Sequence, residues 1–263
     1  MKYHTPRKRF GQNFLEDPFV IQKILQSLQL KPDDHLIEIG PGLGALTKPL
    51  LQMLNHLEVI ELDRDLAKTL QEECHASKNL TLHQADTLKF DFQTLFKNNQ
   101  KLKIVGNLPY NISTPLLFHL LKYSYIIQDM HFMLQKEVVD RLIAKPNSKA
   151  YGRLSIMTQY HCETHFLFTV PPTAFRPAPK VTSAFIRLIP YAKLPFVAHS
   201  IHILQEITTH AFTQRRKILQ NSLKKYLELQ DFERLSINPL SRPENLSVNE
   251  FVQISNYIQE KRS

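Results

Sequence analysis

The chain has 263 residues, of which 22% are charged and 43% are hydrophobic. This length allows one large domain, or a domain of typical size with a smaller appendage, and the composition is that of an ordinary globular protein. No apolar run reaches the roughly 20 residues that a membrane-spanning helix needs. The basic N-terminus lacks the apolar core of a secretion signal, and the two cysteines, Cys74 and Cys162, do not make a disulfide framework. We therefore expect a cytoplasmic protein without a membrane partner.

The net charge of +9 is concentrated in two segments. Residues 1–13 carry four Lys or Arg and no acid, and residues 135–194 carry nine against three acids. A solvated face without a partner would spread its charge more evenly. Concentrated basic charge favours a polyanionic partner, most often nucleic acid. We expect its phosphates to be contacted by Arg7, Lys8 and Arg9 in the first segment and by Arg153 in the second.

Strand and helix patterns alternate along the first half of the chain. A helix is predicted from Asp17, because Asp followed by Pro is a favourable cap and first-turn pair. Further helices are predicted from about residues 44, 113 and 137 and through Leu66 and Leu70, and strands before Gly40 and at residues 57–61, 80–83, 102–105 and 130–134. The alternation indicates an α/β fold with a doubly wound parallel sheet.

The pattern changes after the fifth predicted strand and its helix. Two strand-like runs, 166–170 and 181–189, flank a loop with four prolines, which predicts an antiparallel hairpin at the sheet edge. Beyond a linker at 190–195, apolar residues recur at helical spacing. We therefore predict an α/β domain over residues 1–194 and a small all-helical domain over residues 195–263.

The most informative loop is Glu38-Ile39-Gly40-Pro41-Gly42-Leu43-Gly44, between the first predicted strand and the following helix. Glycines lack a Cβ, so such a loop can turn sharply and let a ligand approach its backbone at a helix N-terminus. A dinucleotide-binding loop reads G-x-G-x-x-G, whereas this loop reads G-x-G-x-G after an acid. It is similar to the first motif of Rossmann-like methyltransferases, which bind S-adenosylmethionine, and we expect Gly40 and Gly42 to contact that cofactor. The alternative is a tight turn that binds no ligand.

Two further acids lie at the ends of predicted strands. Glu61 ends the second strand, and Asp86 follows the third. The carboxyl ends of parallel strands form the ligand crevice of such sheets. A carboxylate at Glu61 can accept hydrogen bonds from both ribose hydroxyls of a nucleoside cofactor, unless it is an ordinary surface acid. Asp86 can accept the adenine amino group of the cofactor, although a turn or a helix cap explains an acid there equally well.

The segment Asn107-Leu108-Pro109-Tyr110 directly follows the fourth predicted strand. It resembles the N/D-P-P-Y/F element of methyltransferases that modify exocyclic amines of bases. Adenine N6 is a poor nucleophile, because its lone pair is delocalised into the ring. The Asn107 side-chain oxygen and the Leu108 carbonyl can accept its two protons and draw the nitrogen toward tetrahedral geometry. Tyr110 can stack on the flipped base. A strand-ending turn at Pro109 is the alternative.

The proline-rich loop contains the segment Phe175-Arg176-Pro177-Ala178-Pro179-Lys180-Val181. Phe175 can close the second face of the target base, and Arg176 and Lys180 can reach phosphates. A lone Phe in a proline-rich loop is more often a packing residue.

Several motifs occur together and in order, at residues 10–15, 38–47, 107–110, 135–138, 151–155 and 175–181. Residues 212–217 and 221–223 in the tail fit the same pattern. Together these segments resemble the ribosomal RNA small-subunit adenine dimethyltransferases, the KsgA family. The resemblance covers the chain from residue 7 to the tail, and no motif residue is missing.

The resemblance implies a class I methyltransferase fold and two successive methyl transfers from S-adenosylmethionine to N6 of each of two adjacent adenosines. The implied substrate is the hairpin near the 3′ end of 16S small-subunit rRNA, in a pre-assembled small ribosomal subunit, with no DNA partner and no metal. Arg215 and Arg216 are implied to contact rRNA. The implied lining of the cofactor site consists of Asn13, Leu15, Gly40, Glu61, Asp86 and Asn107. We expect a monomer that also acts late in small-subunit assembly.

Three other functions remain open from the sequence. One is methylation of large-subunit rRNA, as in macrolide-resistance enzymes, against which the tail motifs argue. Another is a non-catalytic RNA-binding or assembly factor, and the third is an NAD-dependent dehydrogenase, which the loop spacing disfavours. His161 and His165 flank Cys162 and Glu163, but the order is not H-E-x-x-H and no further ligand cluster follows, so we expect no zinc site.

Overall fold

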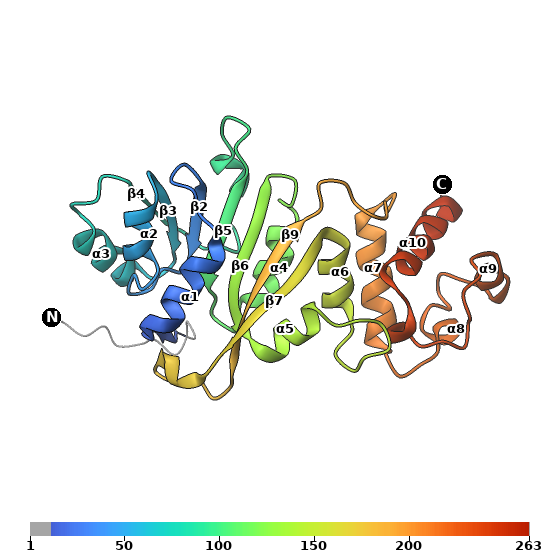
Figure 1. Ribbon diagram of the computed structural model, residues 1–263. Coiled ribbons are helices and arrows are strands. Elements are labelled where there is room, and N and C mark those ends of the chain that lie inside the picture. Colours follow the sequence, from blue (N-terminus) through green and yellow to red (C-terminus); the bar gives the residue numbers. More distant parts are fainter. Residues whose placement is uncertain (1–11, 263) are drawn as a thin grey trace. The chain divides into compact units, whose positions relative to one another are not determined.

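The computed structural model of the protein describes residues 12–262 (Figure 1). Contacts divide these residues into two compact units. The first contains the described residues up to Val139 together with Thr164–Pro190, and the second contains Asp140–Glu163 together with the residues from Tyr191 onward. Residues 140–163, which we expected in the first domain, therefore group with the C-terminal helices. The reason is that the helix in this segment packs against the helices of the tail.

The first unit is built on one sheet. Among the described residues, seven strands pair in the order β4-β3-β2-β5-β6-β9-β7. The strands are β2 (His35–Ile39), β3 (Leu57–Glu61), β4 (Leu80–Gln84), β5 (Leu102–Asn107), β6 (Ile127–Gln135), β7 (Cys162–Val170) and β9 (Ser183–Pro190). Strands β2 to β6 are parallel, and β9 runs antiparallel to β6. This arrangement confirms the predicted doubly wound sheet with an antiparallel edge.

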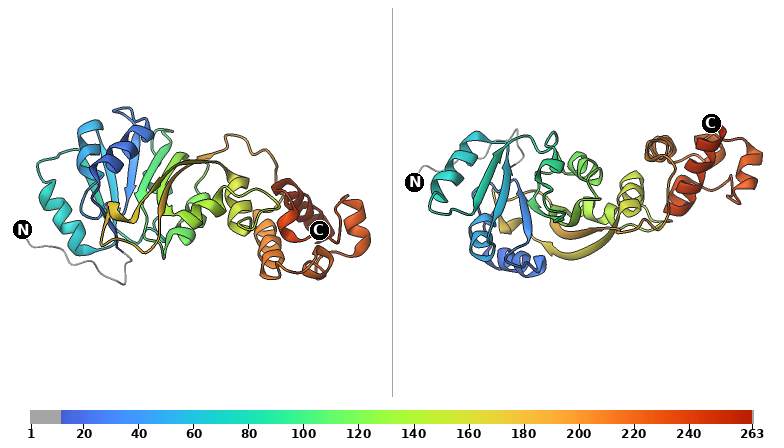
Figure 2. Two further views of the ribbon diagram at one scale, coloured as in Figure 1. Left: turned by 60° about the horizontal axis from the view of Figure 1, so that its bottom comes forward. Right: turned by 90° about the horizontal axis from the view of Figure 1, so that it is seen from above.

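Helices cover both faces of this sheet (Figure 2). They are α1 (Pro18–Leu28), α2 (Thr47–Met53), α3 (Arg64–Glu73), α4 (Ser113–Leu121) and α5 (Lys136–Leu142). Leu28, Leu50 and Leu70, from α1, α2 and α3, belong to one buried cluster with Leu36 and Val59 of the sheet. Helix α4 lies on the opposite face, as right-handed crossovers require where the strand order reverses. The central strands β2, β3 and β5 are buried along almost their whole length, as expected for parallel strands covered on both faces.

A short antiparallel ribbon joins the start of the described chain to the proline-rich loop. It consists of β1 (Phe14–Leu15) and β8 (Phe175–Arg176), with Phe14 opposite Arg176 and Leu15 opposite Phe175. The backbone N–H of Glu16 also donates to the carbonyl of Ala174 at 2.9 Å. Two short 3-10 turns complete this unit, η2 (Phe92–Leu95) and η3 (Pro172–Ala174).

The second unit is helical. Its helices are α6 (Arg153–His161), α7 (Ile201–Thr213), α8 (Leu219–Ser222), α9 (Leu229–Arg234), η4 (Pro243–Asn245) and α10 (Val248–Arg262). Phe212 of α7 packs on Phe251 of α10 and on Tyr151, with ring centroids 5.9 Å and 6.4 Å apart. Each regular element of the described tail from Tyr191 onward is a helix, as predicted. Nowhere in the described chain does a helix combine the length and the apolar character needed to cross a membrane.

Candidate active site

A pocket of about 310 Å³ lies in the first unit, at the carboxyl ends of β2, β3 and β5. The strand order reverses between β2 and β5, and open α/β sheets bind ligands at such a switch point. The lining includes all the residues that we predicted to hold a cofactor, namely Asn13, Leu15, Gly40, Gly42, Glu61, Asp86 and Asn107. It also includes Leu108 and Tyr110. The fold therefore brings together, around one cavity, the glycine loop, the acids at the strand ends, the Asn-Leu-Pro-Tyr turn and the β1 segment.

The glycine loop forms one wall of this pocket. Gly40 and Gly42 have φ angles of +66° and +57°, which side chains with a Cβ rarely adopt. A Cβ on Gly42 would lie 3.0 Å from the Phe14 ring, so this glycine makes room for β1. A Cβ on Gly40 would meet nothing within 4 Å, and that residue lines the pocket. A ligand can therefore approach the backbone at Gly40 directly.

Glu61 ends β3 beside the glycine loop and is 7% exposed. Its Oε2 accepts the N–H of Gly42 at 3.3 Å, and its Oε1 accepts the N–H of Asp63 at 2.8 Å. Burial, the largest effect, raises the pKa of this carboxyl, and the backbone donors oppose the shift. Each carboxylate oxygen can accept a further hydrogen bond. The side chain is therefore held rigidly and can receive a pair of hydroxyl groups from the pocket.

Glu38 is a second buried acid in the pocket wall, and the sequence interpretation gave it no role beyond opening the glycine loop. It is 2% exposed, and the Thr47 hydroxyl donates to its Oε2 at 2.7 Å. Burial raises its pKa to about 7, while the Thr47 hydrogen bond lowers the pKa and Glu61 raises it further. The position of Glu38 just before the G-x-G-x-G loop was the sequence signal that could have identified it as a site residue.

Asp86 fits both interpretations that the sequence allowed. Its Oδ1 accepts the N–H of Leu88 at 3.0 Å, which is the bond of an Asx turn. The same residue lines the pocket, next to Thr87 and Leu88. The turn therefore positions the carboxylate at the cavity, and one role does not exclude the other.

Asn107 ends β5 and reaches the segment around β1. Its side-chain Nδ2 donates to the backbone carbonyl of Asn13 at 2.9 Å. Because the amide nitrogen is used in this way, Oδ1 is the end available as an acceptor in the pocket. The Leu108 N–H donates to the Met133 carbonyl at 3.2 Å, and the Ile112 N–H to the Pro109 carbonyl at 3.1 Å. The motif is thus also a turn anchored to β6.

The aromatic residues of the two loops are placed differently. Tyr110 lines the pocket, and its phenol lies 2.7 Å from the Ser183 hydroxyl. Phe175 is only 4% exposed, belongs to the buried cluster and does not line this pocket. The structure therefore does not bring the two rings together around one cavity, and the stacking role of Phe175 stays a prediction. Arg176 and Lys180 are exposed.

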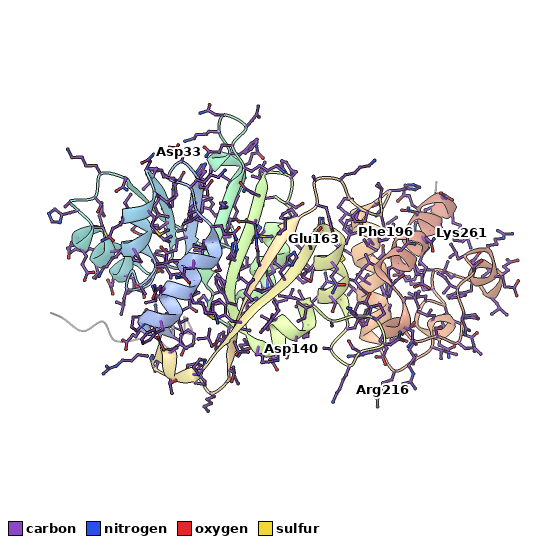
Figure 3. All side chains as sticks on the ribbon, in the orientation of Figure 1. Asp33, Asp140, Glu163, Phe196, Arg216 and Lys261 are labelled. Carbon is purple, nitrogen blue, oxygen red and sulfur yellow. The ribbon has the colours of Figure 1, made fainter. Side chains whose placement is uncertain are left out.

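The predicted RNA-binding residues fall into three groups. Arg7, Lys8 and Arg9 lie outside the described residues. Arg153, at the start of α6, is half-buried. Arg215 donates from Nε to Glu244 at 2.5 Å and from its guanidinium to the Ser148 carbonyl at 3.3 Å, so it clasps two segments of the second unit. Its neighbour Arg216 is exposed (Figure 3).

The His161 and His165 pair does not form a metal site with its neighbours. Between residues 12 and 262, no group of three or more His, Cys, Asp or Glu is arranged to hold a metal ion. Burial lowers the pKa of His161 to about 4. His161 is therefore neutral at physiological pH.

The strand order, the glycine loop and the Asn-Leu-Pro-Tyr turn at the end of β5 define a Rossmann-like class I methyltransferase. Relatives support the same class. A model of the ribosomal RNA adenine dimethylase family matches residues 3–260. The chain is 52% identical over 255 residues to a ribosomal RNA small subunit methyltransferase A from Vibrio parahaemolyticus, covering 97% of this chain and 95% of the relative. A protein of the same name from Acinetobacter baylyi is 54% identical over 252 residues, covering 96% and 92%.

Two solved structures share the fold. A dimethyladenosine transferase from Plasmodium falciparum, 23% identical, matches with a TM-score of 0.80 over 95% of this chain and 98% of the other. The 23S rRNA methyltransferase ErmE, 24% identical, matches with a TM-score of 0.71 over 94% and 100%. The chain belongs to the ribosomal RNA adenine dimethylase family, and it is an rRNA adenine methyltransferase.

Proposed function

We propose that the protein transfers methyl groups from S-adenosylmethionine to two adjacent adenosines in the 3′-terminal hairpin of 16S small-subunit rRNA, dimethylating N6 of each. The observation that carries the proposal is the position of Asn107. It lines the pocket, and its side-chain oxygen stays available as an acceptor because its nitrogen donates to the Asn13 carbonyl. The names of the bacterial relatives, small subunit methyltransferase A, support the choice of subunit.

The pocket suits S-adenosylmethionine. The open space at Gly40 admits the cofactor to the loop backbone, Glu61 would accept the ribose hydroxyls, and Asp86 would accept the adenine amino group. The pocket wall also exposes an apolar side chain, Leu62, which is 48% exposed and can cover a purine face. When bound, this cofactor supplies an electrophilic methyl group.

The residues of the Asn-Leu-Pro-Tyr turn act on the amine. Asn107 Oδ1 and the Leu108 carbonyl accept hydrogen bonds from the two N6–H groups. This draws the nitrogen toward tetrahedral geometry and takes its lone pair out of conjugation with the ring. Tyr110 stacks on one face of the base. Phe175 covers the other face after its loop has moved to let the base enter. No strong base is required, since the proton leaves after the methyl group arrives. Most of the rate enhancement then comes from positioning.

The rRNA is held mainly through its phosphates. Arg176, Lys180 and Arg216 are exposed and can reach them, together with the basic arm that carries Arg7, Lys8 and Arg9. We further propose that the protein is a cytoplasmic monomer with a catalytic domain over residues 1–194, of which residues 140–163 pack with the C-terminal helices. It recognises a pre-assembled small subunit and has a second role late in its assembly.

The test uses small subunits purified from a strain that lacks this protein. Purified protein and S-adenosylmethionine are added, and the rRNA is digested and analysed by mass spectrometry. We expect two adjacent N6,N6-dimethyladenosines near the 3′ end and no product on large subunits in the matched reaction. Methylation of the large subunit alone would assign the other rRNA as substrate. Binding without any product would identify a non-catalytic factor.

A further inference from the structure

Tyr110 forms a long-range contact with a residue that none of the sequence motifs contains. The Tyr110 phenol and the Ser183 hydroxyl are 2.7 Å apart, although 73 residues separate them in the chain. Ser183 is fully buried and is the first residue of β9. The bond therefore joins a pocket residue in the turn after β5 to the strand that runs antiparallel in the sheet.

Backbone contacts fix the position of Ser183. It is paired with Gln135, the last residue of β6, and the Lys136 N–H donates to the carbonyl of Thr182 at 3.0 Å. Strand β6 is in turn paired with β5 from Ile127 to Met133. The Ser183 hydroxyl is therefore held by the sheet, and groups carried on strands are placed more precisely than groups on loops.

The other end of Tyr110 is fixed as well. Its carbonyl accepts the hydroxyl of Ser113 at 3.1 Å, at the start of α4, within the turn that Pro109 and Ile112 close. Burial raises the pKa of the Tyr110 phenol, so the group keeps its hydrogen at physiological pH. A tyrosine held at its backbone and at its hydroxyl has a fixed long axis, so its ring keeps one position beside the pocket.

We propose that Ser183 is a positioning residue for methyl transfer, which acts through the Tyr110 phenol to hold the Tyr110 ring in the position where the target base stacks on it. The inference rests on the proposed function, which gives Tyr110 its stacking role. Without Ser183 the half-buried phenol has to turn toward water, since leaving a buried hydrogen-bonding group unpaired costs more than a made bond contributes. The ring then leaves the stacking position.

The experiment compares Ser183→Ala, Tyr110→Phe and the double variant with the wild-type protein. Single-turnover methyl transfer is measured at saturating S-adenosylmethionine and saturating small subunits, together with both dissociation constants. The matched control is Ser255→Ala in α10, which removes another buried serine hydroxyl, bonded to the Val252 carbonyl at 2.8 Å. The control is expected to transfer at the wild-type rate.

We expect Ser183→Ala to slow transfer on the order of tenfold, with both dissociation constants within about twofold of wild type. Tyr110→Phe keeps the ring and removes the hydroxyl that would otherwise turn toward water. We therefore expect Tyr110→Phe to slow transfer less than Ser183→Ala does. For the same reason the double variant is expected to be faster than Ser183→Ala alone. An independent role for Ser183 would instead make the two losses add.

Three results would overturn the inference. One is transfer at the wild-type rate by Ser183→Ala. Another is a loss of cofactor affinity that matches the loss of rate, which would make Ser183 a support of the pocket. The third applies if Ser183→Ala does not fold, in which case the double variant is compared with Tyr110→Phe. A difference above about twofold between their transfer rates would overturn the inference. Failure of the proposed function is distinguishable, because the wild-type protein itself would then give no dimethyladenosine.

Discussion

The side-chain nitrogen of Asn107 donates a 2.9 Å hydrogen bond to the backbone carbonyl of Asn13, across 94 residues of chain. Because the bond uses the amide nitrogen, the side-chain oxygen of Asn107 is the end that stays available as an acceptor. The bond also ties the Asn-Leu-Pro-Tyr turn to the segment before β1, which lines the same pocket.

Asn107→Ala is expected to slow methyl transfer on the order of a hundredfold to a thousandfold, the usual cost of one lost transition-state contact. Binding of small subunits should change little, because phosphate contacts supply most of the affinity. Asn107→Asp keeps an acceptor but loses the N–H that bonds Asn13, so we expect partial activity. Single-turnover transfer and filter binding measure the two effects. If Asn107→Ala weakened small-subunit binding as much as it slowed methyl transfer, Asn107 would be a substrate-binding residue and not a catalytic one.

Glu61→Ala is expected to weaken S-adenosylmethionine binding on the order of tenfold to a hundredfold, because hydrogen bonds to a buried charged group are lost. It also removes the acceptor of the Gly42 and Asp63 N–H groups. Calorimetry in the presence of a chelator measures the affinity, and Glu73→Ala, which removes an exposed carboxylate of α3, is the control. Binding that requires a divalent ion, or binding of NAD in its place, would contradict this assignment.

The buried acid Glu38 predicts a pH dependence of stability in the cofactor-free protein. Its pKa rises from 4.5 to about 7 on folding, mainly through burial. A raised pKa means that the contribution of Glu38 to stability is fully present below pH 4.5 and is lost as the pH rises to 7. Glu38→Gln should therefore raise the free energy of unfolding at pH 8 by up to about 3 kcal/mol and change it little at pH 4.5.

Urea unfolding at the two pH values measures this effect. Glu16→Gln, at an exposed position, is the control and should leave the pH profile of the wild-type protein intact. Parallel pH profiles for Glu38→Gln and wild type would show that Glu38 is not the group responsible.

Lys180→Glu is expected to weaken rRNA binding and to reduce the salt dependence of the affinity, with cofactor affinity unchanged. Loss of one phosphate contact lowers the slope of log K against log salt by about one. Lys180 is a better test than Arg153, because Arg153 is half-buried and its replacement also disturbs the second unit. Lys68→Glu, at an exposed surface pair with Glu72, is the charge-matched control. Equal salt slopes for the Lys180 and Lys68 variants would remove Lys180 from the RNA-binding surface.

Arg215 and Arg216 are adjacent in sequence but are expected to behave differently. Arg215→Ala breaks the clasp to Glu244 and Ser148, so we expect a loss of about 1–2 kcal/mol in the free energy of unfolding together with weaker rRNA binding. Arg216→Ala should weaken rRNA binding alone, since its side chain is exposed. Thermal unfolding and filter binding separate the two outcomes. An unchanged melting temperature for Arg215→Ala would show that Arg215 does not stabilise the second unit and contributes to RNA binding alone.

Residues at strand ends were predictable because their positions follow from local pattern. Glu61, Asp86 and Asn107 each end or follow an apolar run, and parallel strands deliver such residues to one edge of the sheet. Strand boundaries were less accurate. The strand predicted at 130–134 begins at Ile127, and the helix expected from about residue 44 begins at Thr47.

Contacts between distant segments left no periodic signal in the sequence. The bonds from Asn107 to Asn13 and from Tyr110 to Ser183 depend on how the sheet orders its strands. Phe175 is buried because β8 pairs with β1. Strands of two residues are too short to leave a recognisable pattern in the sequence. The grouping of residues 140–163 with the tail depends on helix packing, which the composition of the linker at 190–195 did not indicate.

The pairing of β1 with β8 sets an order of events during synthesis of the protein. Leu15 is translated 160 residues before its strand partner Phe175. At typical elongation speeds of about 5–20 residues per second, that interval is roughly 8–30 seconds. During this time the five parallel strands can form, while the wall that carries Asn13 still lacks its partner strand. Until translation has passed β8, the pocket wall that carries Asn13 therefore lacks the strand that pairs with it in the complete fold.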